Sequence, residues 1–298
     1  MHDAHTLTLI APSEGMLSLD YLVGPLTSSG FPVAAVHWLA AHVACDLTLA
    51  SPPPPRAYAE TLARCAQQRI DAVLQPQAGR EKKLLISDMD STMIAQECID
   101  ELADKVGLKA HVAAITERAM NGELDFKTAL TERVALLKGL PEATLQAVFD
   151  QHITLMAGAK TLVTTMKARG ASTHLVSGGF TFFSARVAAA LGFDTHEANT
   201  LDVENGQLTG TVRAPILDKD SKRESLLHHA AQQHLPRIAT LAVGDGANDL
   251  PMLLEAGLGV AYHAKPVVEA QAAAAIRYND LTALLYAQGI ARADWVEE

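Results

Sequence analysis

The sequence predicts an α/β protein in which a parallel sheet carries an inserted helical cap and follows a small α+β unit. Three short apolar runs predict the sheet, at residues 84–87, 174–176 and 240–243. Each run ends in polar turn residues and is followed by a helical pattern, which is typical of buried parallel strands. Because ligands bind just beyond the carboxyl ends of such strands, we expect the three polar segments to meet in one crevice.

Residues 1–76 are expected to form a separate domain. Apolar or alternating runs predict four strands, at residues 6–10, 33–39, 43–49 and 71–74. Helical patterns lie between them, at residues 16–28 and 57–68. The order βαββαβ is that of a ferredoxin-like unit and resembles the small ligand-binding ACT module. The polar residues 75–83 are the expected linker to a second domain over residues 82–298.

An inserted cap is expected between the first two predicted strands of the sheet. About four helical segments fill residues 97–151, whereas a crossover needs only about 10–12 residues, helix included. We therefore expect a helical cap over approximately residues 97–157, above the carboxyl ends of the strands. After the second strand, a helix is expected at residues 180–191, and Asn205-Gly206 predicts a hairpin.

The composition excludes several classes of partner. The chain has 298 residues, with 24 Lys and Arg against 34 Asp and Glu, a formal net charge of -10. This balance argues against non-specific binding to nucleic acid or anionic membrane. Three dispersed cysteines without a C-x-x-C pair suggest reduced thiols, and no signal peptide or membrane span is indicated. We expect a cytoplasmic protein with neither nucleic acid nor membrane as a partner.

Asp88 and Asp90 follow the first predicted strand directly and stand two residues apart. In continued strand geometry both side chains would point to the same side. Two carboxylates at one site repel each other, so one is driven toward its protonated form unless a cation intervenes. Such a pair can divide the roles of nucleophile and acid/base, and a carboxylate can attack phosphorus. The alternative is a solvated Asp-rich turn.

Asp245 follows the third predicted strand within Gly244-Asp245-Gly246, where glycines let the backbone approach a ligand. Carboxylate and carbonyl oxygens suit Mg²⁺, which keeps several waters and takes few protein carboxylates. Asp88 and Asp245, with the backbone carbonyl of Asp90, therefore form a candidate Mg²⁺ site. A capped strand-to-helix turn is the alternative for this segment alone, but the agreement of three strand ends favours a site.

Two further segments are candidates for holding a phosphate. Ser177-Gly178-Gly179 precedes a predicted helix, and backbone N–H groups at a helix start bind phosphate, although the same residues also form ordinary turns. Lys222 lies in a capping box at the start of another helix, with Lys219 as a competitor. A phosphoryl group among several aspartates needs a fixed positive charge. The sequence does not choose between the two lysines.

The cap carries an arginine in an unusual place. On a helix predicted over residues 125–138, Arg133 lies in an apolar stripe that begins at Phe126. Such an arginine either extends to the edge of the stripe or meets an anion. Above a phosphate crevice we favour recognition of a substrate carboxylate, with Phe126 as an apolar lid. Glu97 is either a first-turn acid favoured by the helix dipole or an anion for a substrate ammonium.

Together these segments resemble the haloacid dehalogenase-like phosphatases, over about residues 82–285. The shared features are DMDST from Asp88, LVSGGF ending at Phe180, Lys222, and VGDGAND ending at Asp249. Within the cap, Glu97, Phe126 and Arg133 extend the resemblance to the phosphoserine phosphatases. The implied fold is a Rossmann-like core with a helical cap.

The resemblance also implies roles for individual residues. Asp88 would be the nucleophile that forms an aspartyl-phosphate, and Asp90 the acid/base. Mg²⁺ would be bound by Asp88, the carbonyl of Asp90 and Asp245. Glu97 would meet the substrate ammonium and Arg133 its carboxylate. The full set of implied substrate-binding residues is Glu97, Phe126, Arg133, Ser177, Gly178, Lys222 and Asn248.

The expected activity is Mg²⁺-dependent hydrolysis of O-phospho-L-serine, the last step of serine biosynthesis. A phosphotransferase, or a phosphatase for another small phosphomonoester, would use the same first half-reaction. An amino-acid sensor acting on a partner is the non-enzymatic alternative. Serine as a regulatory ligand of residues 1–76 and a homodimer are further expectations.

Overall fold

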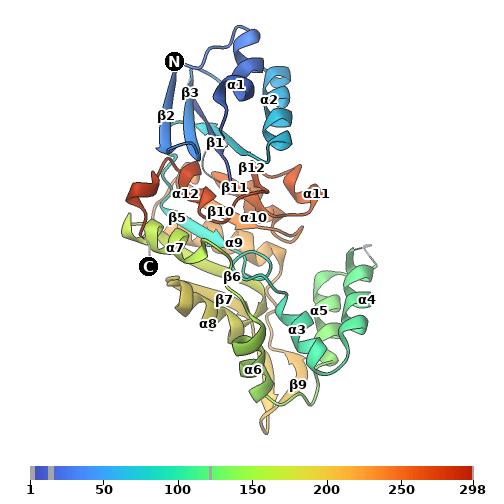
Figure 1. Ribbon diagram of the computed structural model, residues 1–298. Coiled ribbons are helices and arrows are strands. Elements are labelled where there is room, and N and C mark those ends of the chain that lie inside the picture. The colour runs from blue at the N-terminus through green and yellow to red at the C-terminus, as the bar shows by residue number, and fades with distance from the viewer. Residues whose placement is uncertain (1–3, 13–16, 121–122, 297–298) are drawn as a thin grey trace.

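A six-stranded parallel sheet forms the centre of the computed structural model, which describes residues 4–12, 17–120 and 123–296 (Figure 1). The strand order is β12-β11-β10-β5-β6-β7. The three predicted strands are the neighbours β10 (Thr240–Gly244), β5 (Leu84–Ser87) and β6 (Ser172–Phe180). The outer strands are β7 (Thr195–Asn199), β11 (Leu258–Tyr262) and β12 (Ala274–Ile276). The predicted Rossmann-like arrangement is confirmed.

Helices cover both faces of this sheet, which explains why its strands are apolar without alternation. One face packs against α7 (Ala159–Ala168), α8 (Thr181–Leu191) and α12 (Ala283–Ala287). The opposite face packs against α9 (Lys219–Gln232), α10 (Leu250–Glu255) and α11 (Pro266–Glu269). In β5, Leu85 joins the first apolar cluster, whereas Leu84 and Ile86 join the second. No helix in the described part of the chain is long and apolar enough to span a membrane.

Four helices lie between β5 and α7, to one side of the sheet (Figure 1). They are α3 (Cys98–Lys105), α4 (Lys109–Met120), α5 (Phe126–Ala135) and α6 (Ala143–His152). The predicted hairpin pairs β8 (Leu201–Glu204) with β9 (Gln207–Val212) and lies beside α5. The helix expected over residues 125–138 ends at Ala135, because Gly139 then donates a backbone hydrogen bond to Leu208 of the hairpin.

The Ser-Gly-Gly segment differs from the turn that the sequence suggested. Residues 177–179 belong to the end of β6, and α8 begins only at Thr181. The pairing of β6 with β7 shifts between Val176 and Phe180, so the segment is an irregular stretch of strand. Gly178 is therefore not at the start of a helix, and its N–H is not one of the free N–H groups of a first helical turn.

A second, antiparallel sheet forms an N-terminal unit, at the top of Figure 1. Its elements are β1 (His5–Ile10), α1 (Leu19–Ser28), β2 (Ala35–Ala40), β3 (Ala44–Leu49), α2 (Pro55–Gln67) and β4 (Asp71–Pro76). The strand order β2-β3-β1-β4 and the βαββαβ succession give a ferredoxin-like arrangement. The expected start of the first helix at residue 16 lies outside the described residues.

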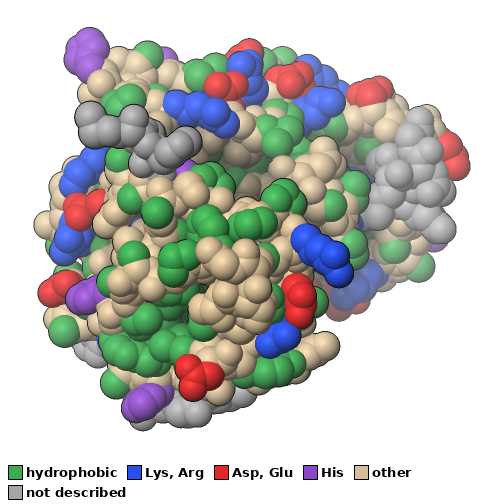
Figure 2. All heavy atoms as spheres, turned by 90° about the horizontal axis from the view of Figure 1, so that it is seen from above, with side chains coloured by type: hydrophobic (Ala, Val, Ile, Leu, Met, Phe, Trp, Pro, Cys, Tyr) green, Lys and Arg blue, Asp and Glu red, His purple; other side chains and the backbone are tan. Residues whose placement is uncertain are grey.

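The N-terminal unit is packed firmly against the rest of the chain. One face of its sheet shares an apolar cluster with α1 and α2. From the other face, Ile10, Leu39 and Val73 enter the large cluster of the central sheet. Seen from this end, the surface carries acidic and basic side chains interspersed around apolar ones (Figure 2).

The segment expected to be a linker is anchored by buried charged groups. The Arg80 guanidinium lies 2.7 Å from the Asp46 carboxylate and also donates to the carbonyl oxygen of Ala287 at 3.2 Å. Lys82 is buried, and its ammonium donates to the carbonyl oxygens of Gly79 and Ile238. Arg80 and Lys82 thus account for part of the polar composition of this segment, of which residues 76–79 are exposed.

We expect Arg80→Ala to lower the free energy of unfolding by about 3 kcal/mol, because it leaves the Asp46 carboxylate buried without its partner. Denaturant unfolding followed by circular dichroism measures the change. Arg223→Ala is the control, since Arg223 forms a largely exposed pair with Glu255 and should cost under about 1 kcal/mol. Equal small losses in both variants would contradict a structural role for Arg80.

Two stacked imidazoles lie between the central sheet and α9. His174 of β6 and His229 of α9 have ring centroids 3.5 Å apart and an interplanar angle of 15°. The Nε2 atoms of both rings are buried without a hydrogen-bond partner among the described residues. Burial, and then the neighbouring His229, lower the pKa of His174 to about 4. Burial therefore favours the neutral form of His174, while the Glu197 carboxylate lies 3.5 Å from Nε2 of His229.

This stack should make stability depend on pH between about 4 and 6.5. In this range the unfolded chain binds a proton at His174 more readily than the folded chain does, so stability falls as the pH falls. The upper limit of the loss is about 3 kcal/mol. We expect His174→Gln to lose less stability than the parent over this range, whereas His111→Gln, at an exposed site, should follow the parent. Parallel curves for all three proteins would contradict this assignment.

Candidate active site

The polar segments after the three neighbouring strands meet at one end of the central sheet. Asp88 follows β5, Ser177 lies at the end of β6, and Asp245 follows β10. The Asp88 N–H donates to the carbonyl oxygen of Val243 at 3.0 Å, which ties the first segment to the third. Asp88 and Ser177 are buried, and Asp245 is half-buried.

Lys222 is the buried positive charge of this site. Its ammonium nitrogen lies 2.7 Å from Asp88 Oδ2 and 2.7 Å from Asp249 Oδ1. Lys219, the alternative suggested by the sequence, is exposed. Burial alone would lower the pKa of Lys222, but attraction to Asp249 and Asp88 outweighs burial and raises it. The lysine therefore stays charged between two carboxylates.

Asp249 is a site residue to which the sequence analysis gave no role. Besides its bond to Lys222, it accepts hydrogen bonds from the backbone N–H groups of Asp245, at 3.1 Å, and Gly246, at 3.0 Å. It thereby shapes the loop that carries Asp245. In the sequence, this role could have been suspected because Asp249 is a second acidic residue four positions after Asp245, at the start of α10.

Three carboxylates form a candidate metal centre. One oxygen each from Asp88, Asp245 and Asp249 lie within 4.8 Å of one another. Burial, and then the neighbouring Asp249, raise the pKa of Asp88, and the same causes in the same order raise that of Asp245 to about 6. A hard divalent cation would relieve this repulsion, and oxygen ligands suit Mg²⁺. Asp88 and Asp245 of this set therefore fit the expected metal, whereas Asp249 is engaged by Lys222 and the loop backbone.

Asp90 lies beside the end of β6. Its Oδ2 is 3.5 Å from the hydroxyl oxygen of Ser177, and its Oδ1 accepts a hydrogen bond from the Cys98 N–H at 3.1 Å. A Cβ atom at Gly179 would lie only 2.6 Å from Asp90 Oδ2, so a glycine is needed for this approach. Burial, and then repulsion from Glu97, raise the pKa of Asp90 to about 7. Such a group can both donate and accept a proton near neutral pH.

The cap reaches this crevice through the start of α5. A Cβ atom at Gly178 would lie 3.0 Å from the ring of Phe126, so the ring packs against the bare backbone of β6. Next to it, the exposed Lys127 ammonium lies 3.0 Å from the carboxylate of Asp218. Asp218 also caps α9, the helix that carries Lys222. The cap therefore contacts Gly178, one of the candidate phosphate-binding residues, and also α9, the helix that carries Lys222.

Glu97 and Arg133 lie on the cap side of the carboxylates. Glu97 accepts a hydrogen bond from the Ser91 hydroxyl at 2.7 Å and repels Asp90 and Asp245 electrostatically. Arg133 is half-buried, and burial lowers its pKa while Asp100, Glu97 and Asp90 oppose that shift. Among the described residues its guanidinium donates only to uncharged oxygens, the side-chain hydroxyl of Thr116 and the backbone carbonyl of Ala129. Arg133 therefore forms no ion pair within 4 Å among the described residues.

Asn248 lies half-buried on the same loop as Asp245, with its side-chain oxygen close against Gly246. The structure thus brings Asp88, Asp245 and Lys222 into one cluster and places Asp90 beside Ser177. It sets Phe126 against Gly178. It does not place Glu97, Arg133 or Asn248 in direct contact with that cluster, and their roles stay predictions.

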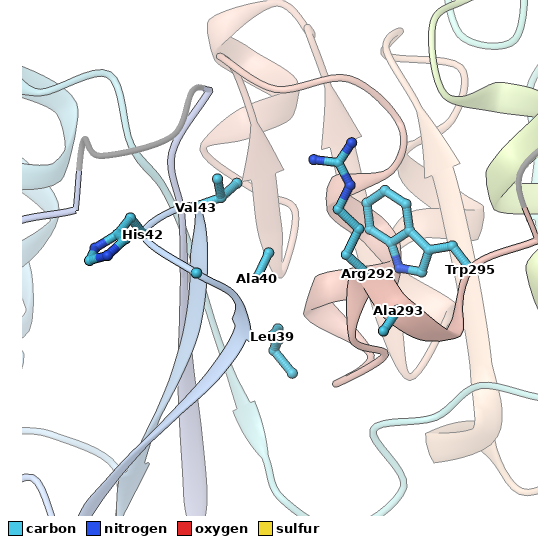
Figure 3. Close-up of a pocket in the computed structure, with 8 residues that line it drawn as sticks. Leu39, Ala40, His42, Val43, Arg292, Ala293 and Trp295 are labelled. Carbon is cyan, nitrogen blue, oxygen red and sulfur yellow. The ribbon is translucent and has the colours of Figure 1, made fainter.

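A separate hollow of about 900 Å³ lies between the turn of residues 39–43 and the C-terminal residues 292–295 (Figure 3). Arg292 and Trp295 line one side of it, and Leu39 and Val43 the other. It contains none of the aspartates described above, so we do not assign catalysis to it.

Comparison with known proteins agrees with this geometry. A model of haloacid dehalogenase-like hydrolases matches residues 85–254, more than half of the chain. A phosphoserine phosphatase of Polaromonas is 50% identical over 208 residues, which are 68% of this chain and 88% of that protein. A phosphoserine phosphatase of Haemophilus influenzae is 46% identical over 202 residues, 68% of this chain, and the match spans only 64% of that longer relative.

Likeness to solved structures extends over nearly the whole chain. The crystal structure of a haloacid dehalogenase family hydrolase from Salmonella enterica serovar Typhi superposes with a TM-score of 0.85. The two sequences are 34% identical, and the match covers 96% of this chain and 98% of that one. The strand-end aspartates, the buried lysine and these matches show that the chain belongs to the haloacid dehalogenase-like hydrolase family.

Proposed function

We propose that this protein is a phosphoserine phosphatase, which hydrolyses O-phospho-L-serine to L-serine and phosphate with Mg²⁺. The observation that carries the proposal is the buried Asp88–Lys222–Asp249 cluster beside Asp90, beneath a cap that presents Glu97 and Arg133. The two relatives described above, both phosphoserine phosphatases, support the same substrate. We further propose the corresponding place in serine biosynthesis and in the cytoplasm.

The chemistry follows from two carboxylates with different surroundings. An oxygen of Asp88 attacks phosphorus, the bond between phosphorus and the seryl oxygen breaks, and Asp90 donates its proton to that oxygen. Asp90 then takes a proton from a water molecule, which attacks the aspartyl-phosphate and releases the Asp88 carboxylate and phosphate. The raised pKa of Asp90, about 7, suits both transfers. Lys222, Ser177 and Gly178 would hold the phosphoryl group, with Asn248 nearby.

Asp88 and Asp245, with the carbonyl of Asp90, would hold Mg²⁺. When bound, the metal supplies positive charge that offsets repulsion between the Asp88 carboxylate and the phosphate dianion. Asp249 keeps its carboxylate on Lys222 and the loop backbone, so we assign it to positioning rather than to the metal.

The cap would supply the choice of substrate. Arg133 has no carboxylate partner among the described side chains and can bind the substrate carboxylate with two hydrogen bonds. Glu97 would accept the substrate ammonium, and Phe126 would close over the ester. An ester that lacks either charge would leave one of these groups unpaired in a closed site.

A phosphotransferase or a phosphatase for another small phosphomonoester remains the enzymatic alternative, because the first half-reaction is the same. An amino-acid sensor is less well supported, since the buried cluster is intact.

We also propose domains at residues 1–76 and 82–298, with the cap at about 97–157. An ACT-like role for the first domain, serine as its regulatory ligand and a homodimer stay predictions. The hollow in Figure 3, next to Arg292 and Trp295, is the place where we would seek serine.

The central test is a screen of small phosphomonoesters with Mg²⁺ and with a chelator. We expect O-phospho-L-serine to be the best substrate and the chelator to abolish its turnover. Asp88→Asn should abolish turnover as well, by at least about 10³-fold, because the nucleophile is lost. Asp294→Asn is the matched control, because it makes the same change at an exposed aspartate outside this cluster, and it should retain activity. Undiminished turnover in Asp88→Asn would end the proposal.

A second test concerns the contact between Lys127 and Asp218. Lys127→Glu places two like charges where the cap meets α9, which should disfavour the closed cap. We expect KM for O-phosphoserine to rise by up to about fivefold, since exposed ion pairs contribute little, and the rise to shrink at high salt. Lys105→Glu, on the neighbouring cap helix, is the control. An unchanged KM at low salt would exclude a role in closure.

A further inference from the structure

Ser91 has a backbone conformation that a serine seldom adopts. Its φ is +54°, in the left-handed region that glycine and asparagine enter more readily. It directly follows Asp90, and its N–H donates to the carbonyl oxygen of Gln96 at 3.3 Å. This bond closes a loop that returns the chain to Glu97. Strained residues of this kind persist where their side chain is needed in one place.

The Ser91 side chain has a defined target. Its hydroxyl donates to Oε1 of Glu97 over 2.7 Å. Glu97 occupies the N-cap position of α3, yet its side chain makes no capping hydrogen bond to that helix. The carboxylate instead lies where the negative charges of Asp90 and Asp245 repel it. A hydrogen bond from a neutral hydroxyl is therefore what holds Glu97 in this direction among the described contacts.

We propose that Ser91 is a positioning residue for recognition of the substrate amino group. Its hydroxyl occupies one oxygen of Glu97 and leaves the other for an ammonium, so it acts through Glu97 and does not itself touch substrate. This assignment rests on the proposed function. It makes the loop after the nucleophile serve two purposes, with Asp90 for proton transfer and Ser91 for selectivity.

The experiment compares two substrates that differ only in the amino group. They are O-phospho-L-serine and the phosphate ester of 3-hydroxypropanoate. In Ser91→Ala we expect kcat/KM for phosphoserine to fall about three- to tenfold, mainly through KM, because a hydrogen bond to a charged group is lost. The value for the ester without the amino group should stay within about twofold of the parent. If its turnover is too slow to measure, its inhibition constant against phosphoserine replaces kcat/KM.

Two further variants separate selectivity from structure. Ser91→Gly accepts the positive φ but lacks the hydroxyl, so it should behave like Ser91→Ala. In a Glu97→Gln background, Ser91→Ala should have no further effect, because Ser91 acts through the charged Glu97 carboxylate that this background lacks. Equal losses for both substrates, additive losses in the double variant, or parental kinetics in Ser91→Gly would each overturn the proposal. Failure of the parent enzyme to hydrolyse phosphoserine would instead refute the proposed function.

Discussion

The structure of this site depends on one interaction, the contact of the Lys222 ammonium with the carboxylates of Asp88 and Asp249. The desolvation free energy of three buried charges can exceed the attraction that they gain from one another. Such a cluster is therefore weak evidence for stability of the fold. It does, however, fix the mutual positions of β5, the loop after β10 and the start of α9. Lys222 lowers the pKa of Asp88, but burial and the neighbouring Asp249 outweigh this effect and raise it.

One lysine does not balance the carboxylates that surround it. Asp90, Asp245 and Glu97 add further negative charge. Burial, and then the neighbouring carboxylates, raise the pKa values of Asp90 and Asp245. A site of this kind binds a divalent cation in exchange for protons. Arg133 of the cap is close enough to Asp100, Glu97 and Asp90 for their charges to raise its pKa against the larger effect of burial. Fold stability has to come from elsewhere, namely the apolar clusters on both faces of the central sheet.

Much of this arrangement was predictable because its signals are local. An apolar run followed by Asp88, Ser177 or Asp245 identifies a strand and its polar end without knowledge of the fold, and the cap follows from an overlong crossover. What could not be predicted depends on contacts between distant segments. Asp249 acquired its role only when α9 brought Lys222 to it, and the expected linker proved to be anchored by Arg80. The Ser-Gly-Gly segment became irregular strand because its register depends on β7.

The order of residues along one short loop links reaction to recognition. Asp88, Asp90, Ser91 and Glu97 lie within ten residues of sequence, between the end of β5 and the first helix of the cap. The N–H of Cys98, the first residue of that helix, donates to Asp90, so a movement of the cap at α3 would change the surroundings of Asp90 directly. Phe126 and Lys127 make a second connection, from α5 to β6 and α9. The cap is therefore joined directly to Asp90, to the end of β6 and to α9 by three non-covalent contacts.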